Sequence, residues 1–368
     1  MYKGPFLLLF TPCRAARDPQ TSNLQPPTSN LQPPRTLILA LALLGGILTA
    51  CNQQPQHASD QLQMLFQGRE YPFAICHNGT YYYTMQSTED NIILYAVTDL
   101  HQLKQAQPKV VWTPDSTSLY HFWAPEIHRI NQNWYIYFEA DDGNTDNHQL
   151  YVIENTNPNP MEGTWTLKGV LRTNDEWNFG LHPNILDLDG ELYLLWSGWP
   201  KRRVEHETQC IYIAHLQNPW TVDSERVMLS QPEYEWERQW IDPDGSRSAY
   251  PIFVNENPQA FLSPDHRLVT VCYSASGIWT RYHILGMLTA PAKANLLDPS
   301  VWTKEPEPVI IQEGVYGTSN ICVVTSCNSD SLYLLYEALY AETPQDELQR
   351  CICLKTISLD NNGHLVFK

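Results

Sequence analysis

The sequence predicts an all-β protein, a five-bladed β-propeller, from two observations. From residue 70 onward almost no segment has helical periodicity, and short aromatic and β-branched runs alternate with turn signals instead. The strongest of these runs recur as a divergent repeat of five hairpins. Their spacing of roughly 50–75 residues suits propeller blades, which are four-stranded sheets set around a central channel. A two-sheet sandwich is the alternative, but sandwich strands need not recur in matched pairs.

Each predicted hairpin consists of a short strand, a tight turn and a second strand rich in aromatic residues. Asn78-Gly79 is the clearest turn, since Asn-Gly favours the two-residue hairpin loop. The second strands are expected at 80–86, 134–139, 191–197, 267–273 and 331–336. The first strands are expected to begin at Phe73, Glu126, Asn184, Gln259 and Asn320.

The segment before the propeller has the pattern of an export signal. Arg35 precedes an apolar run over 36–50, which is too short for a comfortable membrane span, and Cys51 follows. Residues 48–51 (Leu-Thr-Ala-Cys) resemble a bacterial lipobox, in which the cysteine is lipidated. The polar stretch over 52–66 is typical of a flexible tether. A plain secretory signal with a coincidental cysteine is the alternative.

The first residues carry a perfect tandem repeat, since 21–27 (Thr-Ser-Asn-Leu-Gln-Pro-Pro) recur as 28–34. A tandem repeat ahead of an export signal has no evident purpose, so we expect the true translation start to lie downstream. The predicted organisation is a mis-assigned leader plus lipoprotein signal over 1–50, a lipidated Cys51 with its tether over 51–68, and the propeller over 69–368.

Composition limits the partners. The chain has 40 Asp and Glu against 23 Lys and Arg, so nucleic acid, whose phosphates would be repelled, is not expected. The 12 Trp and 20 Tyr fit sugars, because aromatic faces stack on the apolar faces of sugar rings. The nine cysteines contain no C-x-x-C pair and no zinc spacing, so a zinc site is not expected. No other metal and no cofactor are expected. Four of them are interpreted as small core residues: Cys76, Cys272, Cys322 and Cys353.

The functional site is expected where the innermost strands of a propeller begin, since these strand starts converge near the axis. The segments before the first strands are 69–72, 121–126, 180–183, 254–258 and 316–320. Four of the five place a proline beside a polar side chain. Proline fixes the backbone, which suits a strand start that holds a functional group rigidly.

Over about 69–368 the sequence resembles the family 43 glycoside hydrolases, which act chiefly as α-L-arabinofuranosidases, arabinanases and β-xylosidases. The motifs that carry the resemblance are 121–128 (His-Phe-Trp-Ala-Pro-Glu-Ile-His), 196–199 (Trp-Ser-Gly-Trp), 234–238 (Tyr-Glu-Trp-Glu-Arg), 254–259 (Val-Asn-Glu-Asn-Pro-Gln) and 286–289 (Gly-Met-Leu-Thr). The set is most similar to the exo-acting arabinofuranosidase branch.

The resemblance implies an inverting hydrolysis by an acid and a base carboxyl roughly 6.5–9.5 Å apart, with a third carboxylate that tunes the acid. Glu256 matches the general acid, although Asn257 stands where the family usually has glycine. Tyr71 occupies the place of the base, with Glu70 one residue earlier, and His182 occupies the place of the tuning aspartate. The family's axial histidine is missing from 317–320. The resemblance implies substrate-binding roles for Trp123, Glu126, His121, Asn320 and Trp199.

Three accounts of the altered site stay open. Glu70 replaces the base through a one-residue bulge while His182 tunes the acid or relays protons near neutral pH. Alternatively, Tyr71 is a nucleophile activated by Glu70. In the third account, the site binds sugar without cutting it.

The sequence therefore predicts an exported lipoprotein, periplasmic or at the cell surface, with an outer-membrane lipid anchor at Cys51. It is expected to hydrolyse plant-type polysaccharide or oligosaccharide as an arabinofuranosidase-like glycosidase of altered specificity or mechanism. The alternative function is a non-catalytic, glycan-binding surface lipoprotein on the same scaffold.

Overall fold

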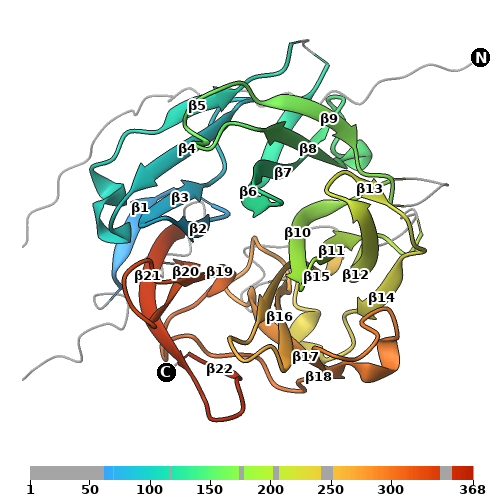
Figure 1. The fold of residues 1–368 in the computed structure, drawn as a ribbon. Coiled ribbons are helices and arrows are strands. Elements are labelled where there is room, and N and C mark those ends of the chain that lie inside the picture. The colour runs from blue at the N-terminus through green and yellow to red at the C-terminus, as the bar shows by residue number, and fades with distance from the viewer. Residues whose placement is uncertain are drawn as a thin grey trace, which may run out of the picture. The chain divides into compact units, whose positions relative to one another are not determined.

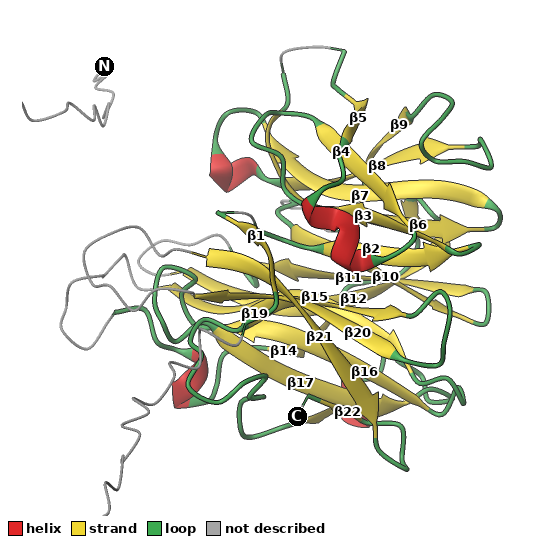
Figure 2. Ribbon diagram, turned by 90° about the vertical axis from the view of Figure 1, so that its left-hand side faces the viewer, coloured by secondary structure: helices red, strands yellow, loops and turns green. Residues whose placement is uncertain are grey.

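The fold was analysed in a computed structural model, which describes residues 62–68, 70–115, 118–173, 178–201, 207–241, 252–339 and 350–367. The predicted signal, Cys51 and most of the predicted tether lie outside these residues. Strands dominate the described chain (Figure 2), and its helices are single 3₁₀ turns: η2 (Leu100–Lys104), η3 (Thr145–Asn147), η4 (Glu235–Glu237) and η5 (Pro299–Val301). No helix among these residues is long and apolar enough to span a membrane. The all-β prediction is confirmed.

The strands form five blades around a central axis (Figure 1), each blade antiparallel within itself. A parallel pairing of β12 (Glu207–Asn218) with β15 (Ile252–Leu262) joins blades 3 and 4 into one nine-stranded sheet. Blade 1 contains β2 (Phe73–His77), β3 (Thr80–Thr84), β4 (Ile92–Val97) and β5 (Lys109–Trp112). Blade 2 contains β6 (Tyr120–Ile130), β7 (Asn133–Asp141), β8 (Gln149–Asn155) and β9 (Thr166–Val170). Blade 3 contains β10 (Leu181–Leu188), β11 (Glu191–Gly198), β12 (Glu207–Asn218), β13 (Thr221–Val222) and β14 (Val227–Ser230).

Blades 4 and 5 complete the ring. Blade 4 contains β15 (Ile252–Leu262), β16 (Leu268–Ala275), β17 (Ile284–Pro291) and β18 (Thr303–Lys304). Blade 5 contains β19 (Ser319–Thr325), β20 (Leu332–Leu339), β21 (Arg350–Leu359), β22 (Leu365–Val366) and β1 (Met64–Gln67). Because β1 pairs with β21, the ring is closed by strands from opposite ends of the described chain.

The five predicted hairpins are the two inner strands of each blade. The turns of blades 1 and 3 have the left-handed backbone that a two-residue hairpin loop requires, with φ of 49° and 77° at Asn78 and Gly79 and of 55° and 95° at Asp189 and Gly190. The sequence places Asn and Gly there because these residues adopt positive φ at low cost.

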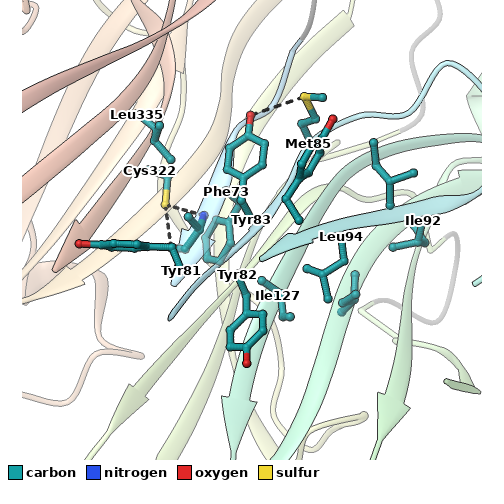
Figure 3. Close-up of a cluster of buried hydrophobic side chains, with 14 of the residues drawn as sticks. Phe73, Tyr81, Tyr82, Tyr83, Met85, Ile92, Leu94, Ile127, Cys322 and Leu335 are labelled. Carbon is teal, nitrogen blue, oxygen red and sulfur yellow. Dashed lines mark hydrogen bonds between the residues drawn. The ribbon is translucent and has the colours of Figure 1, made fainter. Parts of the chain in front are cut away.

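Four clusters of buried apolar side chains fill the space between adjacent blades. Both faces of a blade are covered, so runs such as 134–140 on β7 are buried without alternation. Figure 3 shows part of the cluster around blade 1, where Tyr81 lies beside Cys322 of blade 5 and Leu94 lies on the side of Ile127 of blade 2. Burial of each such side chain contributes roughly 1.5–3 kcal/mol, so apolar packing between blades holds the ring together.

A disulfide joins the first and last blades, between Cys76 on β2 and Cys327 after β19. The interpretation of Cys76 as a plain core residue was therefore wrong. Local sequence patterns could not reveal this pairing, because the two cysteines are 251 residues apart in sequence. Cys272, Cys322 and Cys353 are buried free thiols, as expected of small core residues.

Each innermost strand bends at one residue in the left-handed region, which lies inside the strand or just before it. We call these five the bend residues: Tyr71 (φ 57°), Ala124 (42°), His182 (53°), Asn257 (50°) and Asn320 (43°). Proline follows the first four, which disfavours the right-handed helical conformation at the residue before it. In blades 2 to 5 the ladder between the two inner strands shifts register at this point, as in a β-bulge. The bends thus break each inner strand at the axis.

The bends are held by the preceding blade. We call five polar residues on the second strands the anchor residues: Thr84, Glu139, Ser197, Ser274 and Glu337. Four of them accept the backbone N–H of the next bend residue: Glu139 from His182 (2.6 Å), Ser197 from Asn257 (3.0 Å), Ser274 from Asn320 (3.0 Å) and Glu337 from Tyr71 (2.7 Å). Thr84 donates its hydroxyl to the carbonyl of Pro125 (2.6 Å). Every blade is therefore fixed to its neighbour at the axis.

Candidate active site

A pocket of about 620 Å³ lies where the strand starts converge. It is lined by residues from all five blades. The residues directly before four of the bends face it: Glu70, Trp123, Leu181 and Glu256. We call these the rim residues. The expectation that the strand starts gather around one site is thus met by the positions of these side chains.

Glu70 and Glu256 are the two carboxylates of the rim. Each stands one residue before a bend, so they occupy equivalent positions in blades 1 and 4. Blade 5 separates these two blades in the ring, which places the two side chains on different sides of the pocket. Glu256 is only 8% exposed, and its Oε1 lies 3.8 Å from Nε2 of the buried His283. The rim therefore contributes two carboxyl groups from non-adjacent blades, and Asp146 adds a third carboxyl group to the pocket lining.

Tyr71 also faces the pocket, and its ring lies 5.1 Å from the ring of His182. Burial raises the pKa of the Tyr71 hydroxyl well above 10, and the charge of Glu70 raises it further. The negative charge of Glu70 thus favours the protonated form of the Tyr71 hydroxyl.

His182 is buried in the floor of the pocket. Burial lowers the pKa of its imidazole to about 3, and the nearby His148 adds to this effect. The ring therefore stays uncharged near neutral pH. Its Nδ1 lies 3.5 Å from the hydroxyl of Ser197, and its Nε2 lies 3.8 Å from Oε1 of Glu139. A neutral imidazole here neither replaces a carboxylate charge nor titrates in the physiological range.

Aromatic side chains form much of the pocket wall. Trp199 stacks on Phe179 with ring centroids 3.8 Å apart, and Trp123 stacks on His148 at 4.3 Å. Trp279 completes the aromatic lining. Flat faces of this kind suit the apolar face of a sugar ring. The proposed binding residues Trp123 and Trp199 thus both reach the pocket.

Glu126 is buried and is not among the residues that line the pocket. Its carboxylate accepts hydrogen bonds from the side-chain amides of Asn184 (2.8 Å) and Gln259, and it lies 3.3 Å from Nε2 of His128. Two residues beyond a bend, the side chain enters the axial core. Both carboxylate oxygens of Glu126 thus already accept hydrogen bonds from protein side chains.

His121 and Asn320 also lie outside the pocket lining. The ring of His121 contacts Asp141 at 2.9 Å near the surface. Asn320 is buried at the fifth bend, where its Oδ1 accepts from the amide of Asn257 and the hydroxyl of Ser274, both at 3.0 Å. The proposed binding role of both residues finds no support in their positions.

Sequence reasoning missed two buried carboxylates and one cation near the pocket. Glu139 and Glu337 are fully buried anchor residues, and Arg350 lines the pocket and bonds to Glu337 at 3.3 Å. A signal was present, because every anchor residue directly follows an aromatic residue at the end of a second strand. Aligning those ends would have revealed glutamate in two of the five blades.

Burial raises the pKa of both missed carboxyl groups. For Glu139 the charge of Glu256 adds to the effect. For Glu337 the pKa rises to about 7, although the neighbouring Arg350 opposes the shift. No group of three or more His, Cys, Asp or Glu side chains within the described chain is arranged to hold a metal ion.

Comparison with known proteins identifies the family. The model of glycosyl hydrolases family 43 matches residues 65–365. The chain is 32% identical over 321 residues to an extracellular exo-α-(1→5)-L-arabinofuranosidase of Streptomyces chartreusis, covering 83% of this chain and 91% of that protein. It is 30% identical over 275 residues to α-L-arabinofuranosidase 43 of Humicola insolens, and the match covers 73% of this chain and 54% of that protein.

Solved structures agree with this relationship. The crystal structure of an α-L-arabinofuranosidase from Lactobacillus brevis superposes with a TM-score of 0.72 at 27% identity, covering 85% of this chain and 98% of that one. A thermostable family-43 glycoside hydrolase superposes with a TM-score of 0.63 at 17% identity, which supports the fold alone. The chain belongs to glycosyl hydrolases family 43 and is a glycosidase that hydrolyses glycosidic bonds.

Proposed function

We propose that the protein releases terminal α-L-arabinofuranosyl residues from plant-type polysaccharide or oligosaccharide, with Glu256 as general acid and Glu70 as general base. The observation that supports this most is the equivalence of the two rim carboxylates. They come from non-adjacent blades and both face the same pocket. The choice of arabinofuranose as the sugar is supported by the relatives that are named arabinofuranosidases.

In this mechanism Glu256 protonates the leaving oxygen while Glu70 accepts a proton from the attacking water on the opposite face of the sugar. Inversion requires room for that water, and the two carboxyl groups are then roughly 6.5–9.5 Å apart. Glu256 is nearly buried, which favours its protonated form, whereas Glu70 is half-buried and open to water. The acid and base roles follow from this difference.

The names of the exo-acting Streptomyces relatives support action at chain ends. Glu126, Asn184 and Gln259 are joined by hydrogen bonds near the axis. Tyr71 and His182, uncharged where acidic groups are expected, would alter the preferred sugar or linkage.

The direct test is hydrolysis of α-(1→5)-arabino-oligosaccharides and of 4-nitrophenyl α-L-arabinofuranoside. We expect free arabinose as the product, and Glu256→Gln and Glu70→Gln should each reduce kcat for the oligosaccharide by about 10²–10⁴-fold. Glu256→Gln should affect the nitrophenyl glycoside less, because nitrophenolate leaves without a proton. Oligosaccharide binding without release by the wild-type protein would contradict the proposal and favour a glycan-binding role.

The extracellular names of the Streptomyces relatives support export of this chain as well. We propose a lipid anchor at Cys51, based on the lipobox-like residues 48–51. Labelling cells with radioactive palmitate tests it. Wild-type protein should take up label and fractionate with membranes, whereas Cys51→Ser should do neither. Equal labelling of both proteins would contradict the anchor.

A further inference from the structure

His148 is a fully buried histidine that lines the pocket and that the proposed hydrolysis does not use. Its ring stacks on the indole of Trp123, with centroids 4.3 Å apart and an angle of 28° between the ring planes. The ladder between β6 and β7 shifts register on both sides of Trp123, so regular strand pairing does not fix this residue. The position of this aromatic wall therefore depends on what holds the imidazole.

Both ring nitrogens of His148 face oxygen atoms that can only accept hydrogen bonds. Nδ1 lies 3.0 Å from the carbonyl oxygen of Thr145 and 3.1 Å from Oδ2 of Asp141. Nε2 lies 3.3 Å from the carbonyl oxygen of His121. A neutral imidazole has one N–H and would set a nitrogen lone pair against one of these oxygens, whereas an imidazolium donates on both sides. The contacts therefore fit the doubly protonated ring.

Asp141 is the counter-ion that such a cation requires. Its side chain is fully buried, and its Oδ1 accepts the backbone N–H of Gly143 at 2.7 Å. The ring of His121 is 46% exposed and lies 2.9 Å from the same carboxylate. One buried carboxylate thus lies between an exposed histidine and the histidine that supports the pocket wall.

We propose that His148 is a positioning residue for the sugar: its second proton fixes the imidazolium between Asp141 and the His121 carbonyl, and the ring in turn fixes Trp123 in the pocket wall. The inference rests on the proposed function, since that function places the sugar in this pocket. A wall that is already fixed leaves less to be ordered when the sugar binds. The protein should therefore bind its substrate more tightly at acidic pH than at neutral pH.

The groups around His148 determine when it gains this proton. Burial lowers the pKa of its imidazole below the ordinary value of 6.5, although the carbonyl of Thr145 and the charge of Asp141 oppose this shift. The ring is thus neutral above that value and gains its second proton as pH falls. The neighbouring titratable groups come from four elements: His121 from β6, Asp141 from β7, Asp146 from η3 and His182 from β10.

The test measures the dissociation constant of an α-(1→5)-arabino-oligosaccharide for Glu256→Gln at several pH values. This background prevents hydrolysis and removes the titration of the acid. From neutral pH to about pH 4.5 the affinity should rise by about 2–10-fold, which is the effect of one further hydrogen bond. The double variant Glu256→Gln, His148→Phe keeps a flat ring against Trp123 but has no proton to gain, so its affinity should not rise in this way.

His128→Gln in the same background is the matched control. His128 is also a histidine beside a carboxylate, 3.3 Å from Glu126, but it lies outside the pocket lining. This variant should keep the pH dependence of its parent. If His148→Phe keeps it as well, the proton on His148 plays no part and the inference is overturned. Absence of oligosaccharide binding at every pH is a different result, which overturns the proposed function.

Nitrogen-15 NMR of histidine-labelled wild type covers the case in which His148→Phe does not fold. The His148 ring is identified by its nuclear Overhauser contacts with Trp123. Its Nε2 should gain a proton on acidification, with a midpoint below 6.5. Because the coupling between two binding events is reciprocal, bound arabinose should raise that midpoint by about 0.3–1 unit. An Nε2 that stays unprotonated down to about pH 4.5, or a midpoint that the sugar does not move, would overturn the inference.

Discussion

The backbone N–H of Tyr71 donates a 2.7 Å hydrogen bond to Oε1 of Glu337, which lies 266 residues further along the chain. The bond joins the start of blade 1 to the second strand of blade 5. It fixes the bend that presents Glu70 to the pocket. The same carboxyl binds Arg350, which also lines the pocket. Closure of the ring and orientation of the proposed base therefore depend on one buried group.

Glu337 should make stability depend on pH. Its pKa in the folded chain is raised to about 7 from an ordinary value of 4.5, mainly by burial. The folded state thus holds this proton more tightly than the unfolded state, and the contribution to stability is lost as pH rises from 4.5 to about 7. The free energy of unfolding measured in urea should fall less over this range in Glu337→Gln. An identical fall in both proteins would contradict the assignment.

Hydrolysis should invert the anomeric configuration. If Glu70 activates water and Glu256 protonates the leaving group, the first product is β-arabinofuranose. Proton NMR of the first minutes of reaction distinguishes the anomers before they equilibrate. Initial formation of the α-anomer would instead favour a covalent intermediate, with Tyr71 as the nucleophile.

Tyr71→Phe should preserve most of the activity. Burial and nearby carboxylates raise the pKa of the hydroxyl well above 10, so its oxygen is not released as a nucleophile. We expect kcat to change by less than about tenfold, compared with about 10²–10⁴-fold for loss of an acid or base. Steady-state kinetics beside Glu70→Gln make the comparison, and equal losses in the two variants would refute it.

Trp123→Ala should weaken substrate binding. Trp123 lines the pocket and stacks on His148 at 4.3 Å, so its removal takes away one aromatic face of the wall. An aromatic contact contributes about 0.5–1.5 kcal/mol beyond its buried area, so we expect KM to rise about tenfold. Trp220→Ala is a suitable control, since Trp220 is half-buried and outside the pocket lining. Similar changes in both variants would contradict a binding role.

Removal of the disulfide should destabilise the fold and leave the site intact. The Cys76–Cys327 bond joins the first and last blades, and bonds of this type contribute about 2–4 kcal/mol. The double variant Cys76→Ser, Cys327→Ser should unfold at lower temperature, and a reducing agent should lower the Tm of wild type alone. A wild-type Tm that is insensitive to reductant would show that the bond contributes little.

The fold was predictable because its signals are local. Asn78-Gly79 and the aromatic run after it specify a hairpin without reference to the rest of the chain. Glu70, Tyr71 and Glu256 were also predictable, since strand starts meet at the axis of a propeller.

Other features depend on relations between blades and were not predictable in this way. Glu139 and Glu337 matter because of which bend the neighbouring blade brings against them. Glu126 does not line the pocket, because it stands two residues after a bend and its carboxylate is hydrogen-bonded to Asn184. Cys327 reaches Cys76 only once the ring has closed.

The anchoring of each bend by the preceding blade has a consequence for redesigning the enzyme. The anchor side chain accepts the backbone N–H of its bend, so a substitution at the anchor changes how the bend is held whatever side chain the bend carries. Grafting an aspartate at His182 would crowd a second acidic group against Glu139 unless that anchor became serine at the same time. Variant libraries for new sugar preference should therefore exchange His182 with Glu139, and Tyr71 with Glu337, as linked pairs.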